Sequence, residues 1–238
     1  SATGVGSFDS TGSVSTAAGF SVISYTGNGS GGATVAHGLG SIPHMYIIKR
    51  RDTGSSNWHV YHQSIGATKG LRLNLTNAEN TTDIWQDTAP TSSVFSLGSS
   101  IDVNASGGTY IGYIFSEVKG YSKFGSYTGN GNADGPFVYT GFKPAWVMIK
   151  RTDTANDWNI QDSKRTDYNG KQTTSLQANT TSNESTIGTD FRRDMLSNGF
   201  KIRNDGAETN ASGGTYIYMA FAESPFVNSS GAVPNNAR

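Results

Sequence analysis

The chain of 238 residues has 18 basic and 18 acidic side chains, so its formal net charge is zero and no bulk field exists to attract nucleic acid or an acidic membrane. It contains no cysteine, which excludes disulfides, thiolate nucleophiles and thiolate metal sites. With 30 glycines, 15% charged residues and 11% aromatics, the composition is poor in helix formers and favours an all-β protein.

The first half of the chain predicts an arm followed by short strands. Residues 1–19 are almost all small or polar, which is typical of a linker or N-terminal arm. From residue 20 onward, apolar and polar side chains alternate or form short apolar runs, as strands do. The predicted strands cover residues 20–25, 34–37, 45–48, 58–62, 71–75, 94–97 and 110–115. The last of them is apolar on both faces, so we expect it in the middle of a sheet.

An internal repeat organises the chain. Residues 104–111 return unchanged as residues 210–217, and residues 24–29 return as residues 126–131. Other residues pair off in the same order: Pro43 with Pro144, Lys49-Arg50 with Lys150-Arg151, Asp52 with Asp153, Trp58 with Trp158, Phe115 with Phe221, and Glu117 with Glu223. An offset of about 100 residues is too long for one layer of a solenoid, so each copy is expected to be a small domain. We predict domains at residues 20–118 and 119–227, followed by a C-terminal tail at residues 228–238.

The second copy follows the same course as the first. It predicts strands at residues 137–140, 145–149, 158–161 and 216–221. Residues 165–198 are polar and weakly patterned, which predicts a long loop carrying short strands. No stretch has a convincing helical pattern. Short strands joined by glycine and asparagine turns predict two antiparallel β-sandwiches in tandem, of jelly-roll or lectin-like type.

Neither a membrane span nor a signal peptide is indicated. No run of about eighteen apolar residues occurs, and the N-terminus lacks a charged segment followed by an apolar one. We therefore expect no membrane insertion. Because the chain begins with Ser1 instead of methionine, we expect it to be a processed piece of a longer protein.

Several motifs occur together in an order that is hard to reach by chance. The first copy has Tyr-Thr-Gly-Asn-Gly at residues 25–29, His-Gly-Leu-Gly at residues 37–40 ahead of Pro43, and Ile-Ile-Lys-Arg at residues 47–50. The second copy adds residues 123–130, 135–142, 197–201 and 216–222. This set, spread over residues 20–227, resembles a domain of unknown function that is common in tail-fibre-like proteins of marine bacteriophages. The resemblance implies a virion appendage protein and no catalytic residues.

All four histidines fall in the first copy. His37, His59 and His62 offer metal ligands or acid–base groups. Thr140 stands in the place of His37 in the second copy, however, and Gln161 falls near the place of His62. We therefore expect strand and turn histidines that bond to the backbone.

Alternating oxygen-bearing side chains ahead of Gly107 resemble the opening of a calcium loop. The candidate ligands are Asp102, Asn104 and Ser106, with Glu208, Asn210 and Ser212 at matching offsets in the second copy. An EF-hand would need a glutamate at its twelfth position, which here is Tyr113. We favour the alternative that Asn104 and Ser106 shape a turn and that Gly107 and Gly108 supply positive φ. No metal or cofactor is expected.

Basic and aromatic residues supply the remaining candidates. Basic pairs at residues 49–51, 150–151, 164–165 and 192–193 would suit a polyanion, but Asp52 and Asp153 lie close enough to neutralise two of them. Trp85 and Tyr168 lie in segments that the copies do not share, and an aromatic face matches the apolar face of a sugar, so both are glycan-contact candidates. The repeated Trp58 and Trp158 are expected in the core.

The resemblance to tail-fibre-like proteins implies a non-enzymatic phage virion structural protein, a tail-fibre or appendage segment in the extracellular particle. Nucleophile elbows, P-loops and dinucleotide fingerprints are missing from the sequence. The expected partners are other virion proteins and a host-surface glycan, and we expect a homo-oligomer, favouring a trimer, with residues 165–198 at a subunit interface. The alternatives are a capsid decoration or head-fibre protein, and a carbohydrate-binding module of a secreted bacterial protein.

Overall fold

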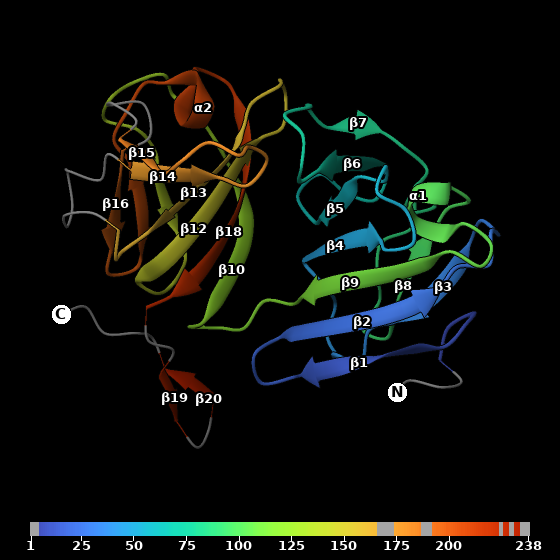
Figure 1. Cartoon of the computed structure of the whole chain (residues 1–238). Helices are drawn as coiled ribbons and strands as arrows, with labels where there is room; N and C mark the ends of the chain where they lie inside the picture. Colours follow the sequence, from blue (N-terminus) through green and yellow to red (C-terminus); the bar gives the residue numbers. More distant parts are fainter. Residues whose placement is uncertain (1–4, 166–173, 187–191, 224–225, 229–230, 234–238) are drawn as a thin grey trace. The chain divides into compact units, whose positions relative to one another are not determined.

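The computed structural model of the chain describes residues 5–165, 174–186, 192–223, 226–228 and 231–233. The chain divides into two compact units. Unit 1 comprises Ser1–Asn74 and Glu79–Glu117, and unit 2 comprises Leu75–Ala78 and Val118–Arg238. Each unit is an all-β sandwich built from antiparallel strands (Figure 1), as the sequence predicts.

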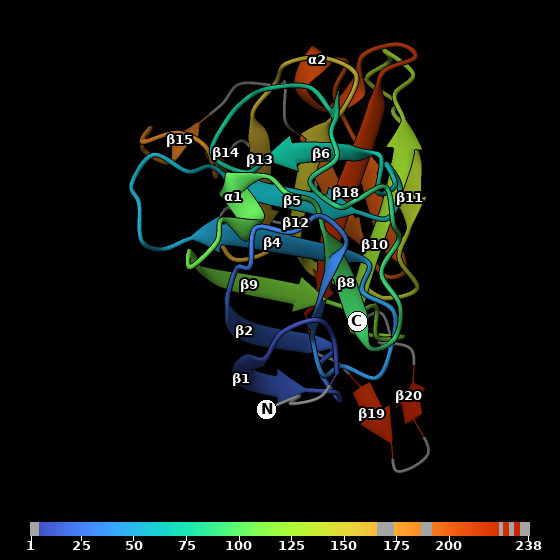
Figure 2. The ribbon, with the colours of Figure 1, turned by 90° about the vertical axis from the view of Figure 1, so that its right-hand side faces the viewer.

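Unit 1 has two layers, formed by β1 (Ser10–Ser15), β2 (Phe20–Thr26), β3 (Ala33–Ala36), β4 (Met45–Arg50), β5 (Trp58–His62), β6 (Lys69–Arg72), β7 (Asn80–Thr81), β8 (Val94–Leu97) and β9 (Thr109–Phe115). The larger layer is a seven-stranded sheet in the order β1-β2-β9-β4-β5-β6-β7. The second layer is the pair of β3 and β8, and β8 runs steeply across the large sheet (Figure 2). β9 lies between β2 and β4, which confirms the prediction of a central strand.

The core of unit 1 lies between these two layers. Ile23 and Tyr25 face it from β2, because alternate residues of a strand point to the same side, and Phe95 faces it from β8. The ring of Tyr46 packs edge-on against Trp85, with 4.9 Å between the ring centroids. Both rings are fully buried.

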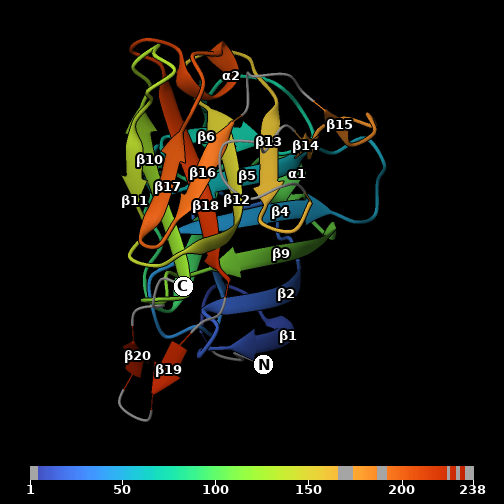
Figure 3. The same ribbon diagram turned by 90° about the vertical axis from the view of Figure 1, so that its left-hand side faces the viewer.

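Unit 2 is built from β10 (Ser122–Thr128), β11 (Phe137–Tyr139), β12 (Pro144–Arg151), β13 (Trp158–Asp162), β14 (Thr174–Gln177), β15 (Ser185–Thr186), β16 (Arg193–Leu196), β17 (Gly199–Ile202) and β18 (Thr215–Ala222). A six-stranded sheet has the order β10-β18-β12-β13-β14-β15. A smaller sheet, β11-β17-β16, packs against it, as Figure 3 shows. Val147 and Tyr216 of the larger sheet meet Met195, Phe200 and Ile202 of the smaller one in the core. A separate hairpin joins β19 (Phe226–Asn228) to β20 (Gly231–Val233).

The two units share one topology. The strand order β2-β9-β4-β5-β6-β7 of unit 1 reappears as β10-β18-β12-β13-β14-β15 in unit 2. The register is also the same, because Tyr25 pairs with Tyr110 in unit 1 and Tyr127 pairs with Tyr216 in unit 2. Four strands have no counterpart among the described residues: β1 in unit 1, and β16, β19 and β20 in unit 2.

The repeated sequences build a structure that we call the duplicated corner, in which a single helical turn is fixed to the start of a central strand. The turn is α1 (Ile101–Asn104) in unit 1 and α2 (Ala207–Asn210) in unit 2. The Tyr110 hydroxyl donates to Ile101 O at 2.7 Å and accepts from Ala105 N at 2.7 Å. The Tyr216 hydroxyl makes the same pair of bonds in unit 2, to Ala207 O and from Ala211 N, both at 2.8 Å.

An asparagine in each copy holds the opposite side of the duplicated corner. Asn104 is fully buried, accepts from Asn28 N at 2.9 Å, and donates to Ser30 O at 2.9 Å and Gly98 O at 3.1 Å. The repeated glycine at position 27 is required there, because a Cβ would lie 2.4 Å from Ala105 O. The repeated residues are therefore framework residues.

Several sequence predictions need correction. Residues 10–15 form the edge strand β1 instead of a linker, and the predicted strand at 71–75 is the shorter β6. The two helical turns contradict the expectation of no helix. Of the two glycines expected at positive φ, only Gly107 has it, at +74°. In the predicted loop at 165–198, residues 166–173 and 187–191 lie outside the described residues.

Candidate functional site

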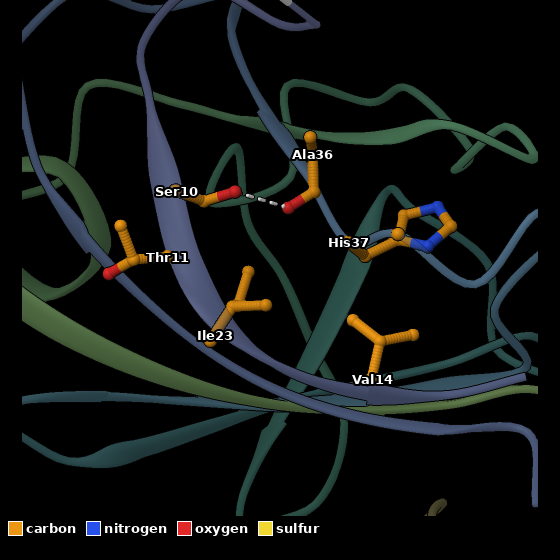
Figure 4. Close-up of a pocket in the computed structure, with 8 residues that line it drawn as sticks. Ser10, Thr11, Val14, Ile23, Ala36 and His37 are labelled. Atoms are coloured by element: carbon orange, nitrogen blue, oxygen red, sulfur yellow. Dashed lines mark hydrogen bonds between the residues drawn. The ribbon is translucent and has the colours of Figure 1, made fainter. Parts of the chain in front are cut away.

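Two pockets of unit 1 lie along β1. The first has a volume of about 230 Å³ and lies between β1 and the end of β3, as Figure 4 shows. Its lining combines the apolar side chains of Val14, Ile23 and Ala36 with polar groups, and the Ser10 hydroxyl donates to Ala36 O at 2.8 Å. His37 borders this pocket but is itself fully buried.

The second pocket is larger, at about 380 Å³, and more polar. We call it the Arg51 pocket, and it is lined by Phe8, Asp9, Thr11, Ser24, Tyr25, Thr26, Arg51, Thr109 and Tyr110. Phe8 is partly exposed and stacks on Tyr25 with 5.6 Å between ring centroids. The hydroxyls of Thr11 and Ser24 lie 3.0 Å apart. The pocket thus combines an aromatic face, hydroxyl groups and two charges of opposite sign.

The charged groups and the Phe8 ring of the Arg51 pocket are specific to unit 1, whereas Tyr25 and Tyr110 recur in unit 2 as Tyr127 and Tyr216. Phe8, Asp9 and Thr11 belong to β1 or to the segment that leads into it. Arg51 is exposed, whereas Thr152 follows the conserved pair Lys150-Arg151 in unit 2 and is buried. The Thr152 hydroxyl lies 2.8 Å from that of Thr215. The described part of unit 2 therefore repeats the strand residues that line the pocket, Ser24, Tyr25, Thr26, Thr109 and Tyr110, without the charged groups and the Phe8 ring.

The sequence reasoning missed this pocket. Two signals were available: Phe8 is the one large apolar residue in residues 1–19, and Arg51 has no basic partner in the second copy. β1, the strand that brings Phe8 and Arg51 together, has no alternation of apolar and polar residues, so the sequence pattern does not reveal it.

Three of the four histidines bond to the backbone, as expected. Nδ1 accepts from a backbone N–H in His37, His44 and His62, at 3.2, 3.0 and 3.2 Å. His59 is different, because its Nε2 lies 3.1 Å from Asp102 Oδ2 and ties β5 to α1. In unit 2 the equivalent positions on β13 and α2 hold Asn159 and Glu208.

Burial governs the titration of two histidines. It lowers the pKa of His37, and it lowers the pKa of His59 although Asp102 opposes the shift. Arg72 and Lys49 lower the pKa of His59 further. Both imidazoles are therefore held neutral in the folded protein at a pH where the unfolded chain takes up protons.

We expect unit 1 to lose stability in mild acid while unit 2, which has no histidine, does not show this loss. A lowered folded-state pKa contributes stability that is present above the unfolded value of 6.5 and is lost as the pH falls through the folded value. Hydrogen exchange of the whole chain at about pH 7.5 and about pH 5, with each amide corrected for its intrinsic exchange rate at that pH, should show lower protection of unit 1 at about pH 5.

The matched variant carries the residues of unit 2, His37→Thr with His59→Asn and Asp102→Glu. It should remove most of the difference between the two pH values. Equal acid sensitivity in the variant and the parent chain would show that other groups control the effect.

Three of the six positions considered for calcium, Asp102, Asn104 and Asn210, form hydrogen bonds within the protein, whereas Glu208 Oε2 is buried without a partner among the described residues. Asp102 bonds to His59, and the Asn104 amide is satisfied by backbone groups of unit 1. In unit 2, Asn210 bonds to Asn130, Asn132 and Asn204. Ser106 and Ser212 lie beside Gly29 and Gly131 in the turns. Within the described ranges, no group of three or more His, Asp or Glu side chains is placed to hold a metal ion.

The aromatic candidates need one correction. Trp85 is 0% exposed and belongs to the core of unit 1, so its face is not available to a sugar. Tyr168 lies outside the described residues. Trp158 is buried as expected, but Trp58 is only partly buried, against Tyr113.

The basic clusters are largely neutralised or buried. Arg50 forms two bonds to Asp52, and Arg151 forms the same two to Asp153, at 2.7 to 3.1 Å. Lys150 is fully buried and donates to Asn156 O at 2.8 Å, and burial lowers its pKa to about 8. Arg51 is the exposed member of its cluster. In the part of the chain that the structure describes, no helix is long and apolar enough to cross a membrane.

Comparison with known proteins gives one match. Residues 1–225 match a protein family described as a domain of unknown function (DUF7483). Neither the curated proteins nor the solved structures include a match to the chain.

Proposed function

We propose that the chain, which belongs to the DUF7483 family, is a non-enzymatic segment of a phage virion appendage that contacts host-surface glycans through the Arg51 pocket. The appendage part of the proposal is supported by the motif order over residues 20–227, which resembles tail-fibre-like proteins. Its partners would be further copies of the chain, as a trimer, and other virion proteins.

The glycan part of the proposal rests on how the residues of the Arg51 pocket differ between the two units. The two units share their framework, and natural duplicates diverge where they recognise different things. Four residues of the pocket occupy positions that the two units do not share: Phe8, Asp9, Thr11 and Arg51. The other lining residues, on β2 and β9, recur in unit 2. A partly exposed ring, hydroxyl groups and an arginine are what a sugar requires, because rings pack on its apolar face and polar groups bond to its hydroxyls.

Replacing Arg51 with threonine, the residue of unit 2, should weaken glycan binding about tenfold or more, since a bond to a charged donor contributes roughly 1.5–3 kcal/mol. The measurement is a glycan array on the whole chain, followed by calorimetric titration of the best ligand. Lys119→Thr is the matched control, because it removes an equal charge at an exposed position outside the pocket.

Binding that is the same in Arg51→Thr and in the parent chain would contradict the assignment of the pocket. Labelling the chain in intact particles tests the other part of the proposal. A position on the capsid shell would favour a decoration or head-fibre protein over a tail appendage.

A further inference from the structure

Arg193 is a fully buried arginine in unit 2. It opens β16, a strand that has no counterpart in unit 1, and its side chain is 1% exposed. It shares its side of β16 with Met195 and stands opposite Ile202 of β17, and both of these residues belong to the core of unit 2. The guanidinium group is thus turned toward the interior of the sandwich.

No acceptor for this guanidinium is found in the described part of the chain. Its Nε and both terminal nitrogens are buried without a hydrogen-bond partner. The adjacent carboxylate, on Asp194, bonds instead to Arg203 at 2.5 Å. Burial raises the pKa of the Tyr127 phenol, and Arg193 is close enough to oppose that rise, but the Tyr127 hydroxyl donates its own hydrogen to Thr209 O.

A buried cation without a counter-ion is unfavourable, because the loss of hydration is not compensated. Burial lowers the pKa of Arg193 to about 10, so the group still carries its charge at neutral pH. Its planar fork of donors matches the paired oxygens of carboxylate, sulfate or phosphate. The guanidinium of Arg193 therefore suits a ligand that carries paired, negatively charged oxygens.

We propose that unit 2 binds a small oxyanion at Arg193, with the guanidinium donating paired hydrogen bonds to it. The site is separate from the Arg51 pocket, and it lies on β16, which the small sheet of unit 2 adds to the shared framework. The oxyanion is either a free ion or the acidic substituent of a sugar.

The test is calorimetric titration of the whole chain, in a buffer free of polyvalent anions, with sulfate, acetate and glucuronate. Saturable binding of one anion per chain is expected for at least one of them. Arg193→Met should weaken it at least tenfold and should raise the unfolding temperature in the anion-free buffer, because an unpaired buried charge is removed. Arg193→Lys should keep part of the binding, which covers the case in which the methionine variant does not fold.

The comparison of ligands separates the two sources. Glucuronate binding at least tenfold more tightly than acetate would identify a sugar acid, and equal affinities would identify a free ion. Absence of saturable binding to the parent chain would overturn the proposal, as would unchanged binding in Arg193→Met. Arg51→Thr must retain this site, so failure of the glycan proposal and failure of the anion proposal are distinguishable.

Discussion

Replacing Asn104 with alanine should lower the free energy of unfolding of unit 1 by about 3 kcal/mol or more. The buried amide bonds to Asn28 N, Ser30 O and Gly98 O, and its removal takes a hydrogen bond from each of these backbone groups of the duplicated corner. Ser30 O alone keeps a second, longer bond, from Ala33 N at 3.4 Å. Each buried group that loses its hydrogen bond costs about 1–3 kcal/mol. Denaturant unfolding of the whole chain, with hydrogen exchange to locate the change, is the measurement.

The internal repeat provides the control for this prediction. Asn210→Ala removes four bonds from the equivalent corner, so it should destabilise unit 2 and leave exchange in unit 1 unchanged. Asn80→Ala, at an exposed position, should change the stability by less than about 0.5 kcal/mol. A loss at Asn104 no larger than that at Asn80 would mean that the corner is held by other contacts.

The strands that the sequence predicts correctly are those with a clear pattern. β5 and β8 match their predicted ranges, residues 58–62 and 94–97, because apolar residues there alternate or form a short run. The topology of unit 2 was predictable from unit 1 through the repeat alone. These predictions depend on local periodicity and on identity between copies, which a single sequence contains.

β1 and the helical turns were missed for physical reasons. β1 is exposed over most of its length, so burial imposes no alternation on its sequence. Gly12 of β1 lets the backbone lie close to β2, since a Cβ at this position would lie 1.9 Å from Val22 O. A turn of four residues is about as long as one helical period, so periodicity does not reveal it. The Arg51 pocket depends on β1 and was missed for the same reason.

The misplacement of Trp85 shows where comparison between copies fails. Divergence between the copies predicts surface recognition at Trp85, yet its ring packs against Tyr46 and Tyr61 at the centre of unit 1. A core position can diverge when the residues around it diverge with it, because volume is what must be conserved. Unshared residues therefore mark recognition only where they are also exposed, as Arg51 is.

Trp85→Ala should destabilise unit 1 by about 3–5 kcal/mol, because it opens a cavity the size of an indole in a close-packed core. Trp85→Phe is the matched control, with a loss of about 1 kcal/mol, because it keeps most of the ring and removes an indole N–H that has no partner in the described residues. Unfolding by denaturant and glycan titration should be measured on both variants. If Trp85 is a core residue, glycan affinity falls only as far as unit 1 unfolds, and the phenylalanine variant binds like the parent chain. Loss of binding in a fully folded alanine variant would instead place the ring at the ligand and contradict its burial.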